Sequence, residues 1–373
     1  MDFSLTDDQR ALSNLAAQIL TDRCTLERLK AIEASDERYD RELWGELAKA
    51  GLLGAALPES VGGSDGGFFA ACLLLEQQGK RVAMLPVLST IVSAALPLAC
   101  FGSKEQQQSY LPGVVAGTTL LSAALSELNS DSRSPVATAT PEGKNWRLSG
   151  VKVAVPMAHS AAAVLVPART AGGDIGVFLV DPKAPGVTLA RQETMNWEAH
   201  FRMDLSNVTV GADSVLGSIA KGAEILGWIV DRTTVGVCAL AAGACQEAVR
   251  LTAEYASNRK QFDKPIAMFQ AVGQRMADSF IDNEAVTLTM WQAASRLADE
   301  MPSDKEIASA KYWAAEGGSR IGHAGLHIHG GISIDIDYPI HRYFLWIKQA
   351  EYTLGAATPQ LVRLGALIAA EPA

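Results

Sequence analysis

The chain has 373 residues, a net charge of −9 and an apolar content of 48%. This length exceeds what one small core accommodates, so two or three domains are expected, and the composition is that of a globular protein. The acidic balance argues against a nucleic-acid partner, because binding a phosphate backbone requires a basic surface.

The five cysteines are scattered along the chain and odd in number. No pair has the spacing of a metal site, which favours a reduced, intracellular protein. The first residues contain no apolar signal core, and no apolar run reaches membrane-spanning length with clean flanks. We therefore expect a cytoplasmic protein with no membrane segment.

The first third of the chain has the apolar periodicity of helices. Thr6 and Gln9 have the spacing of a capping box that opens the first helix. A second helix is expected over residues 41–50, ending at Gly51. Further helical patterns cover about 68–79, 86–101 and 104–117.

Short runs of β-forming residues follow between Leu120 and Gly217, separated by turn signals such as Pro141-Glu142-Gly143. Several short strands at regular spacing predict a small β-sandwich or barrel.

Helical periodicity returns after Gly222. One stripe of small residues runs from Val235 to Val249, Ser303 and Glu306 have capping-box spacing, and Pro339 stands where a fourth helix could begin. Four long helices with short links predict an antiparallel bundle. The fold class is therefore α+β with several domains: a helical domain over 1–118, a β domain over 119–218 and a four-helix bundle over 219–373.

Three segments carry a family resemblance: WGELAKAGLLGAALPESVGG, YASNRKQFDKPIAMFQAVGQRMAD and LHIHGGISIDIDYPIHRYF. Over roughly residues 1–365 the chain resembles the acyl-CoA dehydrogenases, and the second segment is the most specific of the three. The order of helices, β domain and bundle also agrees with the fold of that family.

The resemblance implies a role in binding FAD. It places Arg259 at the FAD pyrophosphate, where a planar guanidinium suits paired phosphate oxygens, with the aromatic ring of Phe262 beside it. It brings Gly330 and Gly331 near the ADP part, where a side chain would block the approach of backbone N–H groups. The other FAD-binding residues implied are Gln261, Phe269, Gln270 and His327.

The catalytic base of the family is missing from its two known positions. An acyl-CoA dehydrogenase needs a carboxylate to remove the α-proton of the thioester. By resemblance these positions fall on Leu354 and Thr233, neither of which can accept a proton. Asp231 and Glu351 are nearby in sequence but fall on neither position, so no catalytic residue is expected in this chain.

The segments that hold the flavin ring in the family are also altered. Glu127 of the family's ring-binding motif remains, but Leu128 replaces a proline, and the glycine-rich sequence that follows is absent. In a later motif Ala154 replaces a tryptophan that packs on the ring, and Pro156 replaces a threonine. A normal flavin-ring site is difficult to build without these groups.

These departures suggest a subunit that shares the FAD of a partner. The chain resembles the non-catalytic subunit of the α2β2 acyl-CoA dehydrogenases that shorten steroid side chains. In such a heteromer a related catalytic chain binds the acyl-CoA and supplies the base, and an electron-transfer flavoprotein accepts the electrons. Two alternatives stay open: a self-sufficient enzyme with a displaced base such as Asp231 or Glu351, and a scaffold protein that has lost the flavin.

Three histidines, His323, His327 and His329, have spacings of two and four residues. On a helix these positions converge poorly, and no cysteine or carboxylate joins them. We therefore expect no metal site here.

Overall fold

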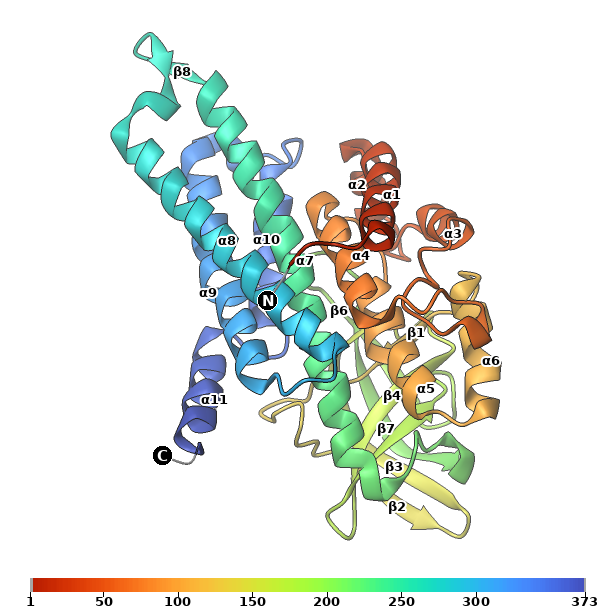
Figure 1. Cartoon of the computed structure of the whole chain (residues 1–373). Coiled ribbons are helices and arrows are strands. Elements are labelled where there is room, and N and C mark those ends of the chain that lie inside the picture. Colours follow the sequence, from red (N-terminus) through yellow and green to blue (C-terminus); the bar gives the residue numbers. More distant parts are fainter. Residues whose placement is uncertain (1–2, 372–373) are drawn as a thin grey trace. The chain divides into compact units, whose positions relative to one another are not determined.

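The computed structural model describes residues 3–371, which form two compact units (Figure 1). One unit combines the residues up to 31 with residues 72–83 and 234 onward, and the other combines residues 32–71 with 84–233. Three helices, α2 (Leu26–Glu33), α4 (Gly67–Arg81) and α7 (Gly222–Asn258), contribute residues to both units. The predicted division into three domains stays a prediction.

The first third of the chain is helical, as expected. Thr6 and Gln9 form the predicted capping box, with Gln9 N–H donating to Thr6 Oγ1 (3.2 Å) and Thr6 N–H to Gln9 Oε1 (3.0 Å). The expected helix over 86–101 divides into a π-helical part and α5, and Pro97, which has no N–H to donate, lies where the α-helical part begins. The elements of this region are α1 (Asp7–Arg23), α2 (Leu26–Glu33), α3 (Arg41–Lys49), η1 (Glu59–Val61), η2 (Val87–Ala95), α5 (Leu96–Phe101) and α6 (Lys104–Val115).

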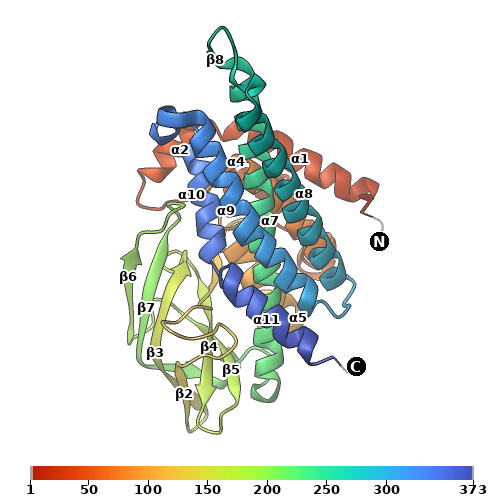
Figure 2. The same ribbon diagram turned by 90° about the vertical axis from the view of Figure 1, so that its left-hand side faces the viewer.

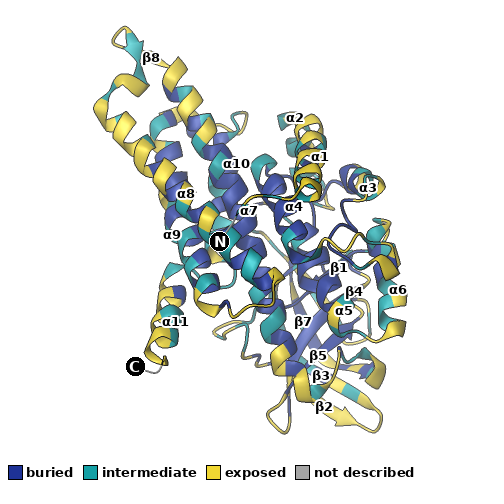
Figure 3. Ribbon diagram, viewed as in Figure 1, coloured by how far each residue is buried: buried dark blue, intermediate teal, exposed yellow. Residues whose placement is uncertain are grey.

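The middle of the chain forms a seven-stranded sheet, in which the strand order is β1-β4-β2-β3-β7-β6 and β5 pairs with β4. The pairings of β1 and β2 with β4 are parallel and the others are antiparallel. Strand β5 is buried along its whole length and β4 at all but one residue, so these two strands lie in the core of this unit (Figure 3). The strands are β1 (Leu121–Ala123), β2 (Thr138–Glu142), β3 (Asn145–Pro156), β4 (Ala163–Thr170), β5 (Ile175–Val180), β6 (Val187–Gln192) and β7 (His200–Gly211), followed by the short helices η3 (Ala212–Ser214) and η4 (Ile219–Lys221).

The last third contains the predicted long helices. Helix α9 packs against α8, α10 and α11, and Figure 2 shows α8 and α9 running side by side along most of their length. The final helix, α11, is additional to the four that were expected. The bounds are α8 (Gln270–Ala298), α9 (Asp304–His329), α10 (Ile340–Tyr352) and α11 (Ala357–Ala369), with η6 (Gly330–Ile334) between α9 and α10.

Helix α7 crosses α4 at a pair of glycines, Gly243 and Gly79. A Cβ atom added to Gly243 would lie 1.9 Å from the carbonyl oxygen of Glu76, and one added to Gly79 would lie 2.1 Å from that of Leu240. The two backbones can approach this closely only because both positions are glycine. The Glu76 side chain accepts hydrogen bonds from Trp291 Nε1 (3.0 Å) and Gln246 Nε2 (3.2 Å), which ties α4 to the bundle helices.

The predicted capping box at the start of α9 is wrong. Ser303 is the N-cap residue, but its side chain makes no capping hydrogen bond. The carboxylate of Glu306 instead lies 3.3 Å from Arg296 Nε at the end of α8. Because the Glu306 side chain forms this ion pair, it does not complete the capping box.

The α7 region is long and apolar enough to cross a membrane by length and composition alone. However, 83% of its most apolar stretch, within residues 219–258, is buried inside the protein. Burial of this extent is what a helix at the centre of a packed unit requires.

Candidate functional site

A short hairpin after α7 carries the most specific of the predicted FAD-binding residues. Strands β8 (Lys260–Gln261) and β9 (Lys264–Pro265) pair in antiparallel fashion, and Ile266 N–H donates to Arg259 O (2.8 Å) at the base of the hairpin. The two turn residues, Phe262 (φ 52°) and Asp263 (φ 63°), both have left-handed backbone conformations, as a type I′ turn requires.

Phenylalanine rarely adopts this conformation, and here the turn leaves its ring 87% exposed. The only ring contact found for Phe262 in the described part of the chain is with the edge of Phe269, at 6.2 Å between centroids. An exposed aromatic ring on a strained turn gains little from its own chain. It is suited to contact a second molecule.

The polar side chains of Arg259 and Gln270, at this hairpin, are also exposed. Arg259 is exposed and forms no ion pair with any carboxylate among residues 3–371. Gln270 is exposed at the first position of α8, and Lys264 Nζ lies 4.4 Å from the ring centroid of Phe269. We call Arg259, Gln261, Phe262, Phe269 and Gln270 the hairpin cluster.

The remaining predicted residues lie at the end of α9, beside the start of α8. Gly330 closes α9 with φ 67° and ψ −142°, a conformation open to glycine alone. Arg275 of α8 donates a hydrogen bond from Nη1 to His327 Nδ1 and so joins the two helices. We call His327, Gly330 and Gly331 the glycine turn. The structure thus brings all eight predicted residues to one end of the α8–α9 pair.

Gly331 differs from Gly330 because its own backbone conformation does not require glycine. Its φ is not positive, and a Cβ atom added there would have no neighbour within 4 Å. Nothing among residues 3–371 therefore excludes a side chain at this position. A requirement for glycine would have to come from a molecule that approaches from outside.

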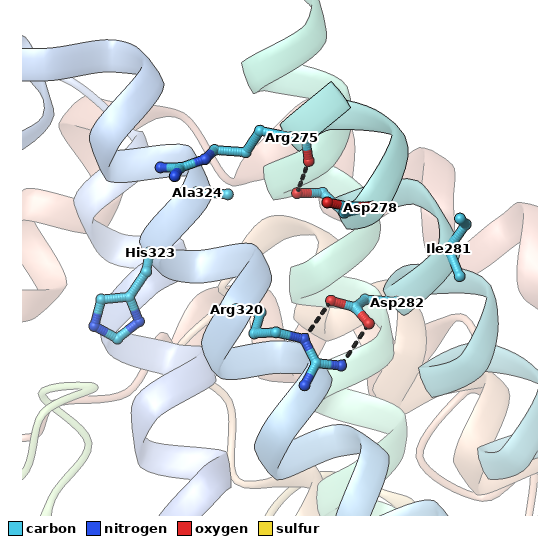
Figure 4. A pocket seen from close by; sticks show the side chains of 8 residues that line it. Arg275, Asp278, Ile281, Asp282, Arg320, His323 and Ala324 are labelled. Carbon is cyan, nitrogen blue, oxygen red and sulfur yellow. Dashed lines mark hydrogen bonds and ion pairs between the residues drawn. The ribbon is translucent and has the colours of Figure 1, made fainter. Parts of the chain in front are cut away.

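Arg275 was not singled out from the sequence. It is exposed on α8, and its guanidinium points toward α9 in Figure 4. It lines a pocket of about 490 Å³ together with Asp278, Ser279, Ile281, Asp282, Arg320, His323 and Ala324. Its place five residues after Gln270 on the same helix is the only sequence signal that could have indicated it.

The segment around Glu127, to which the resemblance assigns the flavin ring, is held by internal contacts. Glu127 accepts hydrogen bonds from the backbone N–H groups of Val136 (2.5 Å) and Ala137 (3.1 Å) and from Lys152 Nζ (2.5 Å). Burial would raise the pKa of Glu127, but the bond to Lys152 and the two backbone donors hold it below its usual value. Lys152 also donates to Pro167 O (2.7 Å). Glu127 and Lys152 thus bond to the sheet and to the loop over residues 128–137.

The loop over residues 128–137 and the irregularity of β3 near Ala154 are also bonded to other parts of the chain. Arg133 forms an ion pair with Asp231. Ala154 lies at an irregularity of β3 with φ 49°, and its N–H donates to Gln192 Oε1 (2.8 Å). Pro156 has no N–H to offer. The groups named here at this end of the sheet are therefore bonded within the chain.

The two positions to which the resemblance assigns the family base, Thr233 and Leu354, carry no carboxylate. Thr233 is buried, and its hydroxyl donates to Ser93 Oγ (3.1 Å). Leu354 lies in the turn after α10 with φ 57°, and its carbonyl accepts from Gln360 Nε2 (3.2 Å). The candidate displaced bases are both ion-paired, Asp231 with Arg133 and Glu351 with Lys348 Nζ at 2.5 Å.

The end of α10, just before Leu354, is held by a buried lysine. Lys311 Nζ donates to the carbonyls of Ala350 and Glu351, both at 2.9 Å. Burial lowers the pKa of Lys311 to about 8, and the helix C-terminus supplies the partial negative charge that favours its protonated form. This lysine stabilises the turn in which the family places its base.

The three histidines of α9 have separate partners. His323 Nδ1 pairs with Ser319 O (2.7 Å), His329 Nδ1 pairs with Gly325 O (2.8 Å), and His327 contacts Arg275. In the part of the chain that the structure describes, no three His, Cys, Asp or Glu side chains are grouped to hold a metal ion.

Comparison with known proteins decides the family. The model described as "Acyl-CoA dehydrogenase, N-terminal domain" matches residues 6–118, and "Acyl-CoA dehydrogenase, C-terminal domain" matches residues 220–366. The acyl-CoA dehydrogenase FadE27 of Mycobacterium tuberculosis is 39% identical over 381 residues, covering all of both chains. The chain belongs to the acyl-CoA dehydrogenase family.

Solved acyl-CoA dehydrogenase structures have the same fold. A chain of the ChsE4-ChsE5 complex from Mycobacterium tuberculosis matches with a TM-score of 0.95 and 39% identity, covering all of both chains. A chain of a variant of the steroid acyl-CoA dehydrogenase Tcur3481-Tcur3483 matches with a TM-score of 0.91 and 44% identity, covering 97% of this chain and 98% of that one. The predicted fold and the resemblance to subunits of heteromeric steroid acyl-CoA dehydrogenases are confirmed.

Proposed function

We propose that this chain is the non-catalytic subunit of a heteromeric, FAD-dependent acyl-CoA dehydrogenase. It completes the FAD site of a catalytic partner chain and supplies no base of its own. The observation that carries the proposal is a contrast between two parts of the chain. The residues suited to contact a cofactor from outside are exposed and available, whereas the residues that would hold a flavin ring are replaced or already bonded.

The hairpin cluster and the glycine turn fit the phosphate and ADP parts of FAD. Arg259 offers a guanidinium that no carboxylate of the described chain neutralises, and such a group binds phosphate oxygens through paired N–H donors. Phe262 adds an exposed aromatic ring in the turn of the same hairpin. Gly331 leaves open space where backbone N–H groups can approach an anion closely.

The base and the flavin ring are assigned to the partner. FAD, when bound, accepts the β-hydride of the acyl-CoA, and a carboxylate of the partner chain removes the α-proton. In this chain Thr233 and Leu354 cannot perform that proton transfer. The ion pairs of Asp231 and Glu351 speak against a displaced base, because both carboxylates are already engaged by cations of this chain.

The assembly and the substrate class follow from the relatives. Two of the similar structures are named as complexes of two chains, and one of these is called a steroid acyl-CoA dehydrogenase. We extend both properties to this chain: an α2β2 heteromer that acts on a steroid side-chain CoA thioester and passes electrons to an electron-transfer flavoprotein.

The test is to produce the chain alone and together with a full-length acyl-CoA dehydrogenase chain encoded beside it. Size and visible spectrum are measured for both products. We expect the lone chain to be colourless, and the pair to be a yellow heterotetramer with about one FAD per two chains. A lone chain with one FAD per chain and dehydrogenase activity would show that the base is displaced and that the proposal is wrong. A pair that assembles without flavin would indicate a scaffold protein.

A further inference from the structure

We infer that Arg275 is a positioning residue, which orients the His327 ring so that its Nε2–H is presented to the ADP part of FAD. The inference rests on the proposed FAD site and deepens it, because it assigns a function to a residue outside the family pattern. The two side chains come from different helices, 52 residues apart in the sequence, and they meet at the end of the α8–α9 pair that carries the glycine turn.

The hydrogen bond determines the tautomer of His327. A guanidinium only donates, so a nitrogen that receives its N–H must carry a lone pair and no proton. When Nδ1 is the acceptor, a neutral imidazole holds its proton on Nε2. Arg275 therefore holds His327 in the tautomer whose single donor, Nε2–H, faces away from Arg275.

The surroundings leave Arg275 free for this role. The nearest other guanidinium in the pocket, Arg320, is held by Asp282 through two bonds of 2.8 and 2.6 Å, as Figure 4 shows. Asp282 is buried and is satisfied by that pair. Within residues 3–371 Arg275 has no carboxylate partner, and His327 has no hydrogen-bond partner other than Arg275. The Nε2–H of His327 is thus available to a ligand.

A simpler alternative is that Arg275 binds a phosphate of FAD directly. The two possibilities differ in how they depend on His327. If Arg275 acts through the ring, its removal has no effect once the ring is replaced by a side chain whose donor is permanent. If it binds FAD itself, its removal weakens FAD in either background.

A double-mutant cycle on the co-produced complex separates these cases. FAD affinity is measured by equilibrium dialysis for wild type, Arg275→Met, His327→Gln and the double variant. The glutamine amide always carries N–H donors. We expect Arg275→Met to weaken FAD by about five- to tenfold, the size of one hydrogen bond, and to have no further effect in the His327→Gln background. An equal loss in both backgrounds would overturn the inference.

A second measurement does not depend on FAD. Solid-state ¹⁵N spectra of the chain labelled at its six histidines report which ring nitrogen is protonated, and the His327→Gln variant assigns the signal of His327. We expect an unprotonated Nδ1 in wild type and a mixture of tautomers in Arg275→Met. A protonated Nδ1 in wild type would refute the positioning role, whereas the expected spectrum from a complex without FAD would refute only the proposed function.

Discussion

Replacing Arg259 by alanine tests the FAD-completing role most directly. Arg259 is exposed, carries no ion pair in the described chain, and its carbonyl accepts from Ile266 N–H at the base of the hairpin. A charge-assisted pair with a phosphate contributes about 1.5–3 kcal/mol. Its loss should therefore weaken FAD binding by about 10- to 150-fold. Arg259→Lys should fall between alanine and wild type, because lysine retains the charge but not the paired donors.

The same substitution should leave folding unchanged. Surface side chains without partners usually alter the free energy of unfolding by less than about 0.5 kcal/mol. The matched control is Arg250→Ala on α7, the helix that ends just before Arg259. Arg250 is also exposed, but its guanidinium is engaged by Glu247 at 2.8 Å and Glu254 at 2.9 Å. This control should lower stability slightly and leave FAD affinity at the wild-type value.

The assay is FAD affinity of the co-produced complex, measured by recovery of flavin fluorescence on release, with thermal unfolding recorded in parallel. The loss in Arg259→Ala should shrink at high salt, because screening weakens the phosphate contact of the wild type as well. Wild-type affinity in Arg259→Ala, with the complex intact, would refute the assignment of this residue to the FAD phosphates. A loss of equal size in Arg250→Ala would show that the effect is structural.

Three further substitutions test other parts of the structure. Gly331→Ala should fold as well as wild type, because a Cβ atom at this position meets nothing within the described chain. It should nevertheless weaken FAD binding by about tenfold. The control Gly365→Ala, at an equally open position on α11, should not change FAD binding. Gly243→Ala should lower the free energy of unfolding by about 1–3 kcal/mol or more in a thermal melt, because its Cβ would lie 1.9 Å from the carbonyl of Glu76 and the helices must separate. Burial raises the pKa of Glu198 from 4.5 to about 7. The folded state therefore binds more protons than the unfolded state, and the free energy of unfolding should fall as the pH rises from about 4.5 through 7, by at most about 3 kcal/mol. In denaturant titrations at pH 5 and pH 8, Glu198→Gln should remove this contribution to the difference in stability. An unchanged difference would contradict the raised pKa of Glu198.

The fold was largely predictable from the periodicity of apolar residues and from turn chemistry. The capping box at Thr6, the change from helices to strands near Leu120 and the return of long helices after Gly222 are local signals, and the structure has all of them. The prediction failed where a local pattern competed with a longer contact. Glu306 has the spacing to cap α9, but it pairs with Arg296 of the preceding helix instead.

The hairpin cluster was readable because its members lie within twelve consecutive residues, so one motif identifies them together. The sequence also showed that Leu354 and Thr233 carry no carboxylate, since the chemistry of a side chain does not depend on its surroundings. The relation of Arg275 to His327 was not accessible, because it joins two helices through a contact that no spacing encodes.

The sequence by itself therefore determined the class of fold and the family, because these depend on residue type and on local periodicity. Tertiary structure alone decided which charged groups are available: Asp231 and Glu351 are paired, whereas Arg259 is not. It also decided that Gly331 faces open space while Gly243 lies against another helix. The physical reason is that ion pairing and steric exclusion depend on distances between segments far apart in the chain, and those distances exist only after the helices have packed.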